Sequence, residues 1–353
     1  MTRAFSDPRN TRVSSARVNV LIASPLDADL VARIAAVDAR LNVVHRPHLI
    51  GSARFPGDHT PPIQRSPAEV GEWAELLADA EVLFDIERPV VPHLPNRAPR
   101  LRWVQTTSSG VGEWIRDQRL AETPIVVTNA AGIHAAALAE FAAFAMLYFA
   151  RDMPRLLAEQ RAHHWERCAV ESLRGKTLGI VGLGKVGREV ARVARAFGMC
   201  VVGSRRTVAE VDGVDRVFPP EKLHELLAMS DYVVLIVPHS AETSGMIGAA
   251  ELRVMRPGAV LINIARGAIV DEAALIEALR SRHLRGAALD VFQREPLPQE
   301  SPLWDMPNVL VTPHSMSTVR DENERLVDLF CANLRRYLDG GDLLNVVDKV
   351  RGY

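Results

Sequence analysis

The stretch from Thr177 to Thr207 constrains the fold more than any other part of the chain. It begins with a short apolar, β-branched run, which is typical of a buried parallel strand. After this run come the six residues of a G-x-G-x-x-G motif: Gly182, Leu183, Gly184, Lys185, Val186 and Gly187. Apolar residues then recur at helical spacing up to Gly198, which is suited to a helix C-cap, and a second apolar run starts at Cys200. The pattern predicts a strand, a helix and a second strand.

Each glycine of the motif has its own physical role in such a unit. Gly182 allows the tight turn out of the strand, Gly184 lets a pyrophosphate approach the backbone, and Gly187 lets the helix pack close to the sheet. Unpaired N–H groups at the start of the helix face the phosphate. A G-x-G-x-x-G also occurs in structural glycine turns, which is the alternative. Its place between a strand and a helix favours dinucleotide binding.

Length and charge narrow the class of protein. A chain of 353 residues is too long for one average domain, so we expect two. With 42 Lys+Arg against 43 Asp+Glu, nothing points to a nucleic-acid partner or an anionic membrane surface. The three cysteines are odd in number and far apart, and Cys200 lies in an expected core strand. Buried free thiols in a reducing compartment are therefore expected.

No segment resembles a membrane span or a secretory signal. The most apolar run, Leu138 to Ala150, contains Glu140 and is too short to cross a bilayer. Residues 1–16 carry charges without an apolar signal core, so we expect a disordered tail and a cytoplasmic protein with no membrane partner.

Strand and helix patterns alternate along the rest of the chain, which predicts parallel α/β domains. The expected helical stretch from Leu138 to Leu157 has a wide apolar surface, with more area than one neighbouring element of the same chain can cover. The last expected helix, Ser317 to Tyr337, follows the final strand and is expected to cross back to the first domain. The expected strands are 18–24, 43–46, 82–86, 101–106, 125–128, 178–181, 200–203, 232–237, 259–265, 286–291 and 309–312.

Three ionisable residues follow expected strands at their carboxyl ends, where ligands bind in open parallel sheets. Arg266 follows LINIA, Glu295 follows ALDVFQR and His314 follows VLVTP. An arginine grips a carboxylate with two hydrogen bonds, and a histidine paired with a carboxylate donates or accepts a proton. Taken singly, each has a simpler interpretation: a solvated surface arginine, a turn before Pro296, and a loop histidine. The pattern alone leaves both interpretations open.

Several segments together resemble the D-isomer-specific 2-hydroxyacid dehydrogenase family, in that family's order from about residue 100 to 320. They are WVQTTSSGV, TNAAGIHAAALAEF, GLGKVGREVARVARAFGM, INIARGAIVDEAALIEAL, GAALDVFQREPLP and SPLWDMPNVLVTPH. The resemblance implies an α/β fold of two Rossmann-like doubly wound parallel-sheet domains. A substrate domain (17–130 and 318–353) would hold an inserted dinucleotide-binding domain (131–317).

The resemblance also implies roles for individual residues. Arg266 would bind and polarise a 2-oxo acid, His314 would protonate its carbonyl oxygen, and Glu295 would hold His314 in place. Backbone N–H groups of Ser109, Gly110 and Val111 would bind the substrate carboxylate. The cofactor would lie against the glycine motif and against Ser204, Arg205, Arg206, Val237, Pro238, Thr243, Ile264, Ala265 and Asp290.

Two positions depart from the family's pattern. Gly112 stands where many members have Asp, which affects the shape of the substrate loop. Arg205 lies 18 residues past Gly187, where NAD-using members carry an acid that binds the ribose 2′-OH. Ser204, Arg205 and Arg206 instead offer a hydroxyl and two guanidinium groups, which suit a 2′-phosphate. We therefore expect NADP to be preferred, with NAD possible if the arginines are merely solvated.

The predicted activity is hydride transfer from NADPH to a small 2-oxo acid, of the glyoxylate or hydroxypyruvate type, giving the D-2-hydroxy acid. The resemblance also implies a homodimer. Phosphoglycerate oxidation is disfavoured because the chain ends 39 residues after His314, and formate oxidation because Glu295 is retained where formate-oxidising members carry Gln. The alternatives are a nucleotide-sensing corepressor-type protein and an NAD-dependent dehydrogenase of another 2-hydroxy acid.

Overall fold

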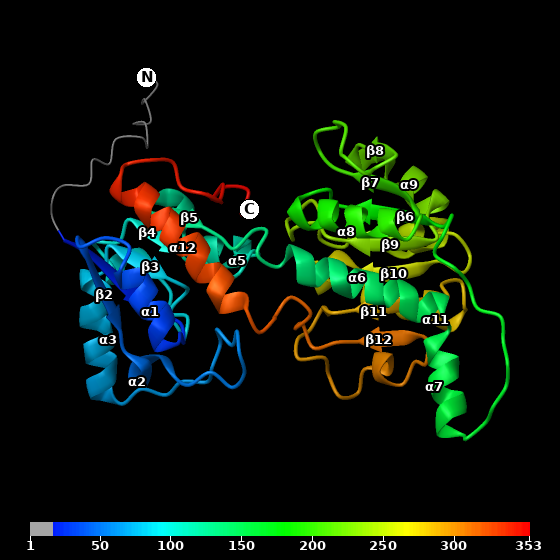
Figure 1. Ribbon diagram of the computed structural model, residues 1–353, viewed down its shortest axis with the longest axis horizontal. Helices are drawn as coiled ribbons and strands as arrows, with labels where there is room; N and C mark the ends of the chain where they lie inside the picture. Colours follow the sequence, from blue (N-terminus) through cyan, green and yellow to red (C-terminus); the bar gives the residue numbers. More distant parts are fainter. Residues whose placement is uncertain (1–16) are drawn as a thin grey trace. The chain divides into compact units, whose positions relative to one another are not determined.

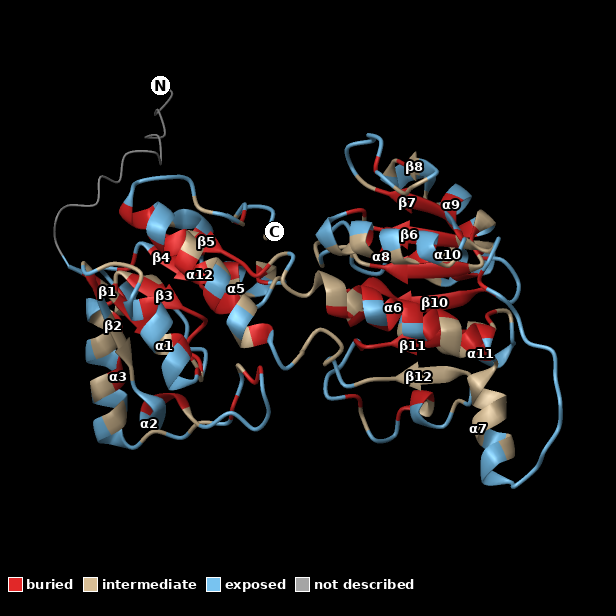
Figure 2. Cartoon of the chain, in the orientation of Figure 1, coloured by how far each residue is buried: buried red, intermediate tan, exposed pale blue. Residues whose placement is uncertain are grey.

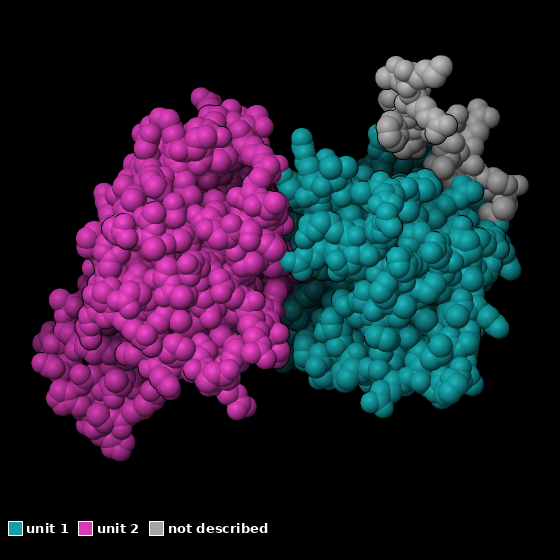
Figure 3. All heavy atoms as spheres, turned by 180° about the vertical axis from the view of Figure 1, so that it is seen from behind, with its two compact units in different colours: residues 1–133, 318–353 teal, residues 134–317 magenta. Residues whose placement is uncertain are grey.

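A computed structural model describes residues 17–353, so the expected disordered tail lies outside the described residues. The described chain divides into two compact units, which are coloured separately in Figure 3. Unit 1 comprises the residues up to Ile133 together with Thr318–Tyr353, and unit 2 comprises His134–Ser317. Each unit contains a parallel sheet with apolar clusters on both faces, which confirms the predicted α/β fold class. Within residues 17–353 no helix is long and apolar enough to span a bilayer.

Unit 1 is built on a five-stranded sheet in the order β2-β1-β3-β4-β5 (Figure 1). Its elements are β1 (Val18–Ile22), α1 (Ala28–Ala35), β2 (Leu41–His45), α2 (Pro47–Ile50), α3 (Pro67–Asp79), β3 (Val82–Phe84), α4 (Leu94–Arg97), β4 (Trp103–Gln105), α5 (Gly112–Asp117), the 3-10 turn η1 (Leu120–Glu122), β5 (Val126–Thr128) and α12 (Glu322–Leu338).

The period of two in the strands of unit 1 supplies both faces of its core. Val18, Val20 and Ile22 join the cluster of α1 and α12, whereas Leu21 joins the cluster of α3 and α5. In the first cluster the ring of Phe330 on α12 lies 4.8 Å from that of Phe84 and 5.2 Å from that of Trp103, measured between centroids. The last helix is therefore part of the core of unit 1.

Unit 2 is built on a seven-stranded sheet in the order β12-β11-β10-β9-β6-β7-β8. Its elements are α6 (Ala135–Ala150), α7 (Met153–Arg161), β6 (Thr177–Val181), α8 (Lys185–Ala196), β7 (Cys200–Ser204), β8 (Arg216–Phe218), η2 (Pro220–Lys222), α9 (Leu223–Met229), β9 (Tyr232–Leu235), α10 (Ala249–Val254), β10 (Val260–Asn263), η3 (Gly267–Ile269), α11 (Glu272–Arg280), β11 (Gly286–Leu289), η4 (Pro302–Trp304) and β12 (Val309–Val311).

The strand order of unit 2 reverses at β6, which lies between β7 and β9. Leu178 and Ile180 pack toward α6 and α8, and Val181 packs toward the opposite cluster with α9, α10 and α11. Figure 2 shows the resulting buried strands between partly exposed helices. In open parallel sheets, ligands bind at the carboxyl ends of the strands next to the point where the strand order reverses.

The structure corrects three details of the sequence analysis. Cys200 is exposed instead of buried, because it is the first residue of β7 and lies at the margin of the sheet. Cys168 is also exposed, and only Cys331 is buried. The last helix begins at Glu322, five residues later than expected. The sequence analysis also missed β8, a three-residue strand whose first residue is exposed.

Candidate active site in unit 2

The expected functional residues of unit 2 lie at the carboxyl ends of its strands or in the loops that follow them. The strands are parallel, so these ends lie along the same edge of the sheet. Arg266 follows β10, Asp290 and Glu295 follow β11, and His314 follows β12. The glycine motif follows β6, in the same sheet. The topology therefore brings residues more than a hundred positions apart in the sequence to one edge.

The glycine motif turns tightly from β6 into α8. Gly182 has φ +112°, and a Cβ there would lie 3.0 Å from the backbone carbonyl of Ile236. A Cβ on Gly187 would lie 2.1 Å from the carbonyl oxygen of Gly182, so α8 packs directly on the turn. The N–H groups of Gly182 and Leu183 both donate to the carbonyl oxygen of Ser204, at 3.1 Å. This pairing fastens the turn to the end of β7.

The motif also has the features that a bound pyrophosphate requires. A Cβ on Gly184 would meet no atom within 4 Å, so the backbone is open to a ligand at this position. Gly184 is the N-cap of α8, and no side chain caps the helix. The first N–H groups of a helix have no partner within it and attract anions. The residues of the motif thus fit the phosphates of a dinucleotide.

The end of β7 presents Arg205 and Arg206 after a buried Ser204. Arg205 is half-buried and fixed through its backbone, since its N–H donates to the carbonyl oxygen of Phe218 at 3.1 Å. Arg206 forms an ion pair with Glu242, a residue that the sequence analysis did not single out. Glu242 lies in the loop that follows the carboxyl end of β9. Because ligands bind at these ends in open parallel sheets, the loop could have been singled out from the sequence.

The loops after β9 and β10 hold the other residues expected near a cofactor. Thr243 closes the first loop, because its hydroxyl donates to the carbonyl oxygen of Pro238 at 2.7 Å, one residue after Val237. Ile264 and Ala265 are buried, and the N–H of Ala265 donates to Asn263 Oδ1 at 3.1 Å. Both loops are held by short-range hydrogen bonds.

His314 and Glu295 form a close pair. The distance from His314 Nδ1 to Glu295 Oε2 is 2.7 Å, and both side chains are slightly more than a third exposed. Glu295 also accepts a hydrogen bond from the N–H of Phe292 at 3.0 Å. Burial raises the pKa of Glu295, but the hydrogen bonds from His314 and Phe292 outweigh it, so the net pKa is lowered. Glu295 is held as a carboxylate that orients the imidazole.

Arg266 reaches the same neighbourhood through the turn that follows β10. Its positive charge contributes to the lowered pKa of Glu295. Asn263 Nδ2 donates to the carbonyl oxygen of Arg266 at 3.1 Å, which fixes the backbone. A Cβ on Gly267 would lie 1.8 Å from the carbonyl carbon of Phe292, so the Arg266 turn packs directly against the loop that carries Glu295. The structure thus brings together Arg266, Glu295 and His314.

Asp290 braces the loop that carries His314. Its buried carboxylate accepts hydrogen bonds from the N–H of Ser315 at 3.0 Å, the N–H of Met316 at 3.3 Å and the hydroxyl of Thr312 at 2.8 Å. Burial raises the pKa of Asp290 and outweighs these hydrogen bonds, which lower it. The residues on both sides of His314 are thereby tied to the end of β11. His314 itself has φ +51°, in the left-handed region.

The expected substrate loop belongs to unit 1 and lies between β4 and α5. Val111 is buried and is the N-cap residue of α5. The N–H of Gly110 donates to Ser108 Oγ at 3.3 Å, and the carbonyl oxygen of Ser109 accepts from Asn129 Nδ2 at 3.0 Å. The loop is held within its own unit, whereas the Arg266, Glu295 and His314 group lies in unit 2.

Unit 1 also contains a polar group that sequence reasoning did not identify. His59 Nδ1 lies 2.7 Å from Ser24 Oγ, and His59 Nε2 lies 3.6 Å from Glu322 Oε1. Burial lowers the pKa of His59, but Glu322, Asp85 and Asp58 outweigh it, so the net pKa is raised. Ser24 lies two residues after the end of β1, and Asp85 directly follows β3. Their place at the carboxyl ends of parallel strands was therefore the available signal.

Comparison with known sequences places these observations in a family. A family model described as the NAD binding domain of D-isomer specific 2-hydroxyacid dehydrogenase matches residues 143–315. The chain is 35% identical to glyoxylate reductase of Thermococcus litoralis over 293 residues, 79% of this chain and 87% of that protein. It is 33% identical to D-3-phosphoglycerate dehydrogenase of Methanocaldococcus jannaschii over 288 residues, which are 78% of this chain but only about half (53%) of that protein.

Solved structures give the same assignment. A D-isomer specific 2-hydroxyacid dehydrogenase from Xanthobacter autotrophicus Py2, solved in complex with NADPH and MES, has a TM-score of 0.78 and 32% identity, covering 96% of this chain and 100% of that one. An NADPH-dependent glyoxylate/hydroxypyruvate reductase from Sinorhizobium meliloti, solved with NADP and sulfate, has a TM-score of 0.77 and 26% identity, with coverage of 96% and 100%.

Proposed function

Because the chain belongs to the D-isomer-specific 2-hydroxyacid dehydrogenase family, we propose that it reduces a small 2-oxo acid of the glyoxylate or hydroxypyruvate type to the 2-hydroxy acid. Where that product is chiral, it has the D configuration. The observation that carries the proposal is the 2.7 Å pair of His314 and Glu295, with Arg266 on the adjoining turn. These side chains can bind a carboxylate and donate a proton to an atom next to it.

A nicotinamide cofactor fits the glycine motif and the open backbone at Gly184. When bound, it supplies a hydride to C2 of the 2-oxo acid. The first turn of α8 would hold its pyrophosphate. Ile264, Ala265 and Asp290, at the ends of β10 and β11, would border the nicotinamide, and Val237, Pro238 and Thr243 would complete the cofactor site.

The protein's own residues would handle the substrate and its proton. Arg266 would bind the carboxylate and polarise the 2-oxo group with its guanidinium. Because Nδ1 of His314 is directed at Glu295, Nε2 is the ring nitrogen left to carry a proton for the substrate oxygen. Glu295 would keep the imidazole oriented and stabilise its protonated form. We assign the backbone N–H groups of Ser109, Gly110 and Val111 to the substrate carboxylate, to which the N–H of Gly110 would turn from Ser108 Oγ.

We propose NADP as the preferred cofactor, with NAD as a weaker alternative. Arg205 would be the main ligand of the 2′-phosphate, since Arg206 already pairs with Glu242. Arg206 would reach the phosphate only by exchanging that partner. A phosphate offers the charge and acceptor oxygens that a guanidinium prefers. Ser204 is buried, so its hydroxyl contributes less than the sequence suggested.

We propose a homodimer that associates through unit 2. On α6, Phe144 is 51% exposed, and α7 carries no buried residue although it contains Leu156 and Leu157. Further along, Trp165 is 92% exposed. Exposed large apolar side chains gathered on neighbouring segments are typical of protein–protein interfaces.

The experiment that tests the function is a turnover assay. Oxidation of NADPH and of NADH is followed by absorbance with glyoxylate, hydroxypyruvate, pyruvate and 3-phosphohydroxypyruvate. The proposal expects the first two substrates with NADPH to give the highest kcat/KM. Tight cofactor binding without turnover of any 2-oxo acid would contradict it and would favour the nucleotide-sensing alternative.

A further inference from the structure

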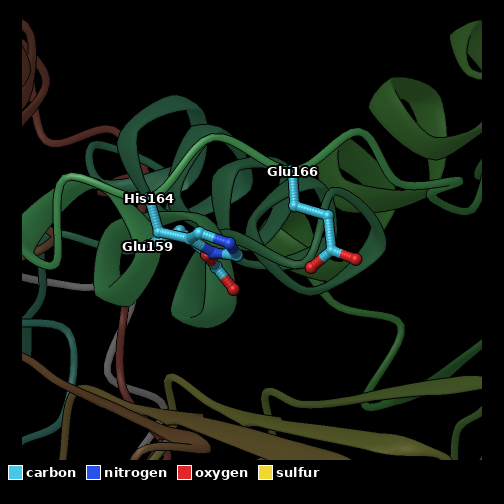
Figure 4. A group of neighbouring side chains, drawn as sticks. All are labelled: Glu159, His164 and Glu166. Atoms are coloured by element: carbon cyan, nitrogen blue, oxygen red, sulfur yellow. The ribbon is translucent and has the colours of Figure 1, made fainter.

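Polar side chains outside the proposed catalytic group differ in what they touch. Glu159, His164 and Glu166 lie close together at the end of α7 and in the exposed segment after it (Figure 4), on the part of unit 2 assigned above to the homodimer. Thr106 and Asn129, by contrast, are buried in unit 1 and contact the backbone of the substrate loop. These two side chains have no role yet in the proposed reaction.

Two successive carbonyl oxygens of the substrate loop are held from the ends of β4 and β5. The carbonyl oxygen of Ser108 accepts the hydroxyl of Thr106 at 2.8 Å and the N–H of Ala130 at 3.2 Å. The carbonyl oxygen of Ser109 accepts Asn129 Nδ2 at 3.0 Å. Thr106 directly follows β4 and Asn129 directly follows β5, so both donors come from the rigid sheet.

These hydrogen bonds also set the direction of two backbone N–H groups. In a trans peptide group the C=O and the N–H that follows it point in opposite directions. The carbonyl of Ser108 shares its peptide group with the N–H of Ser109, and the carbonyl of Ser109 shares its group with the N–H of Gly110. Because both carbonyls are directed at the ends of β4 and β5, both N–H groups face away from these ends. Successive N–H groups on one side of a turn attract anions.

The surroundings of Asn129 explain why an amide is needed there. Its Oδ1 accepts the N–H of Ala131 at 3.0 Å, which leaves the Nδ2 end of the amide for Ser109. Its backbone is paired with Asn345, since the N–H of Asn129 donates to the carbonyl oxygen of Asn345 at 3.1 Å and Asn345 Nδ2 donates back at 3.2 Å. The side chain thus accepts at one end and donates at the other, and a carboxylate of the same shape only accepts.

We infer that Thr106 and Asn129 are positioning residues for substrate binding. By holding the carbonyl oxygens of Ser108 and Ser109, they turn the next two N–H groups toward the substrate carboxylate before it arrives. The inference rests on the proposed function, because it concerns the loop that binds the substrate of that reaction. Both residues act through the loop, so they set the affinity for the 2-oxo acid and leave the transfer of hydride and proton to the groups of unit 2.

Variants of nearly unchanged shape separate this role from stability. N129D keeps the acceptor oxygen of the side chain and loses its donor. T106V removes the hydroxyl, and T106S retains it. Thr128 provides the matched control, because its hydroxyl is also buried in unit 1 but donates to Gln105 Oε1 at 2.8 Å. T128V therefore removes a buried hydrogen bond of the same sheet that does not involve the carbonyl oxygens of the loop.

The test is a fluorescence titration of the full-length, NADPH-loaded protein with oxamate, an unreactive analogue of a 2-oxo acid, at pH 7.5. KM and kcat for glyoxylate and unfolding in urea are measured alongside. We expect N129D and T106V to weaken oxamate binding and to raise KM by about tenfold, with kcat changed by less than about threefold. T106S should bind oxamate like the wild type. T128V should unfold at a lower urea concentration and keep the wild-type oxamate affinity.

Wild-type oxamate affinity and KM in either N129D or T106V would overturn the inference. It would also be overturned if T128V weakened oxamate binding as much as T106V does, or if T106S failed to restore it, because either result indicates a general loosening of unit 1. Oxamate binding needs no turnover. A wild type that binds oxamate but reduces no 2-oxo acid would therefore contradict the proposed function, and the variants would still decide the inference. A wild type that neither binds oxamate nor reduces a 2-oxo acid would contradict both.

Discussion

Replacement of Asp290 is the sharpest test of how the structure holds His314, the proposed proton donor. Asp290→Ala removes the acceptor for the N–H groups of Ser315 and Met316, the two residues after His314. Asp290 is 2% exposed, so water cannot readily replace its carboxylate as the acceptor of these hydrogen bonds. A buried donor left without a partner costs ~1–3 kcal/mol, and two of them give a loss of about 2–6 kcal/mol in the free energy of unfolding.

Asp290→Asn separates the hydrogen bonds from the charge. Its amide oxygen still accepts from the two N–H groups, so we expect a loss of only about 1 kcal/mol. The assays are denaturant unfolding and kcat with NADPH and glyoxylate. In Asp290→Ala we expect kcat to fall by more than tenfold, because His314 is no longer held within reach of the substrate. Wild-type stability and kcat in Asp290→Ala would refute the reasoning.

Five further substitutions test the site and the assembly. His314→Ala should lower kcat by ~10²–10⁴-fold, the usual contribution of a positioned general acid, while Arg266→Ala should lower kcat/KM and leave NADPH binding intact by fluorescence titration. The pKa of Glu295 is lowered in the folded protein, so its carboxylate stabilises the fold above its ordinary pKa, and this stabilisation is lost as the pH falls through the folded-state pKa. Glu295→Gln should therefore make the free energy of unfolding less dependent on pH between about pH 6 and 3, as measured by unfolding midpoints. Arg205→Asp should reverse a preference for NADPH of roughly ten- to a thousand-fold in kcat/KM, and a wild type that favours NADH would contradict the assignment. Phe144→Asp should turn a dimer into a monomer by light scattering, and a monomeric wild type at micromolar concentration would exclude the interface.

Local sequence patterns predicted the fold class because its determinants are local. The motif from Gly182 to Gly187 requires a strand before it and a helix after it, and the structure has both. The apolar run at residues 18–24 predicts a strand, and the structure has β1 there, with its side chains packed on both faces of the sheet. Cys200 shows the limit of this reasoning, because burial at a strand's first residue depends on what lies over the end of the sheet.

The sequence by itself determined which residues follow the strands, and therefore that Arg266, Glu295 and His314 were candidates. It left open whether they meet, since Glu295 and His314 are 19 positions apart and a loop histidine fits the same pattern. Only the tertiary structure decided this, because the order and register of β10, β11 and β12 set which loops are neighbours. The Arg206–Glu242 pair and the group of Ser24, His59 and Glu322 likewise depend on how separate segments fold back in space. Contacts between side chains that are far apart in the sequence leave no periodic signal in it, whereas strands and helices do.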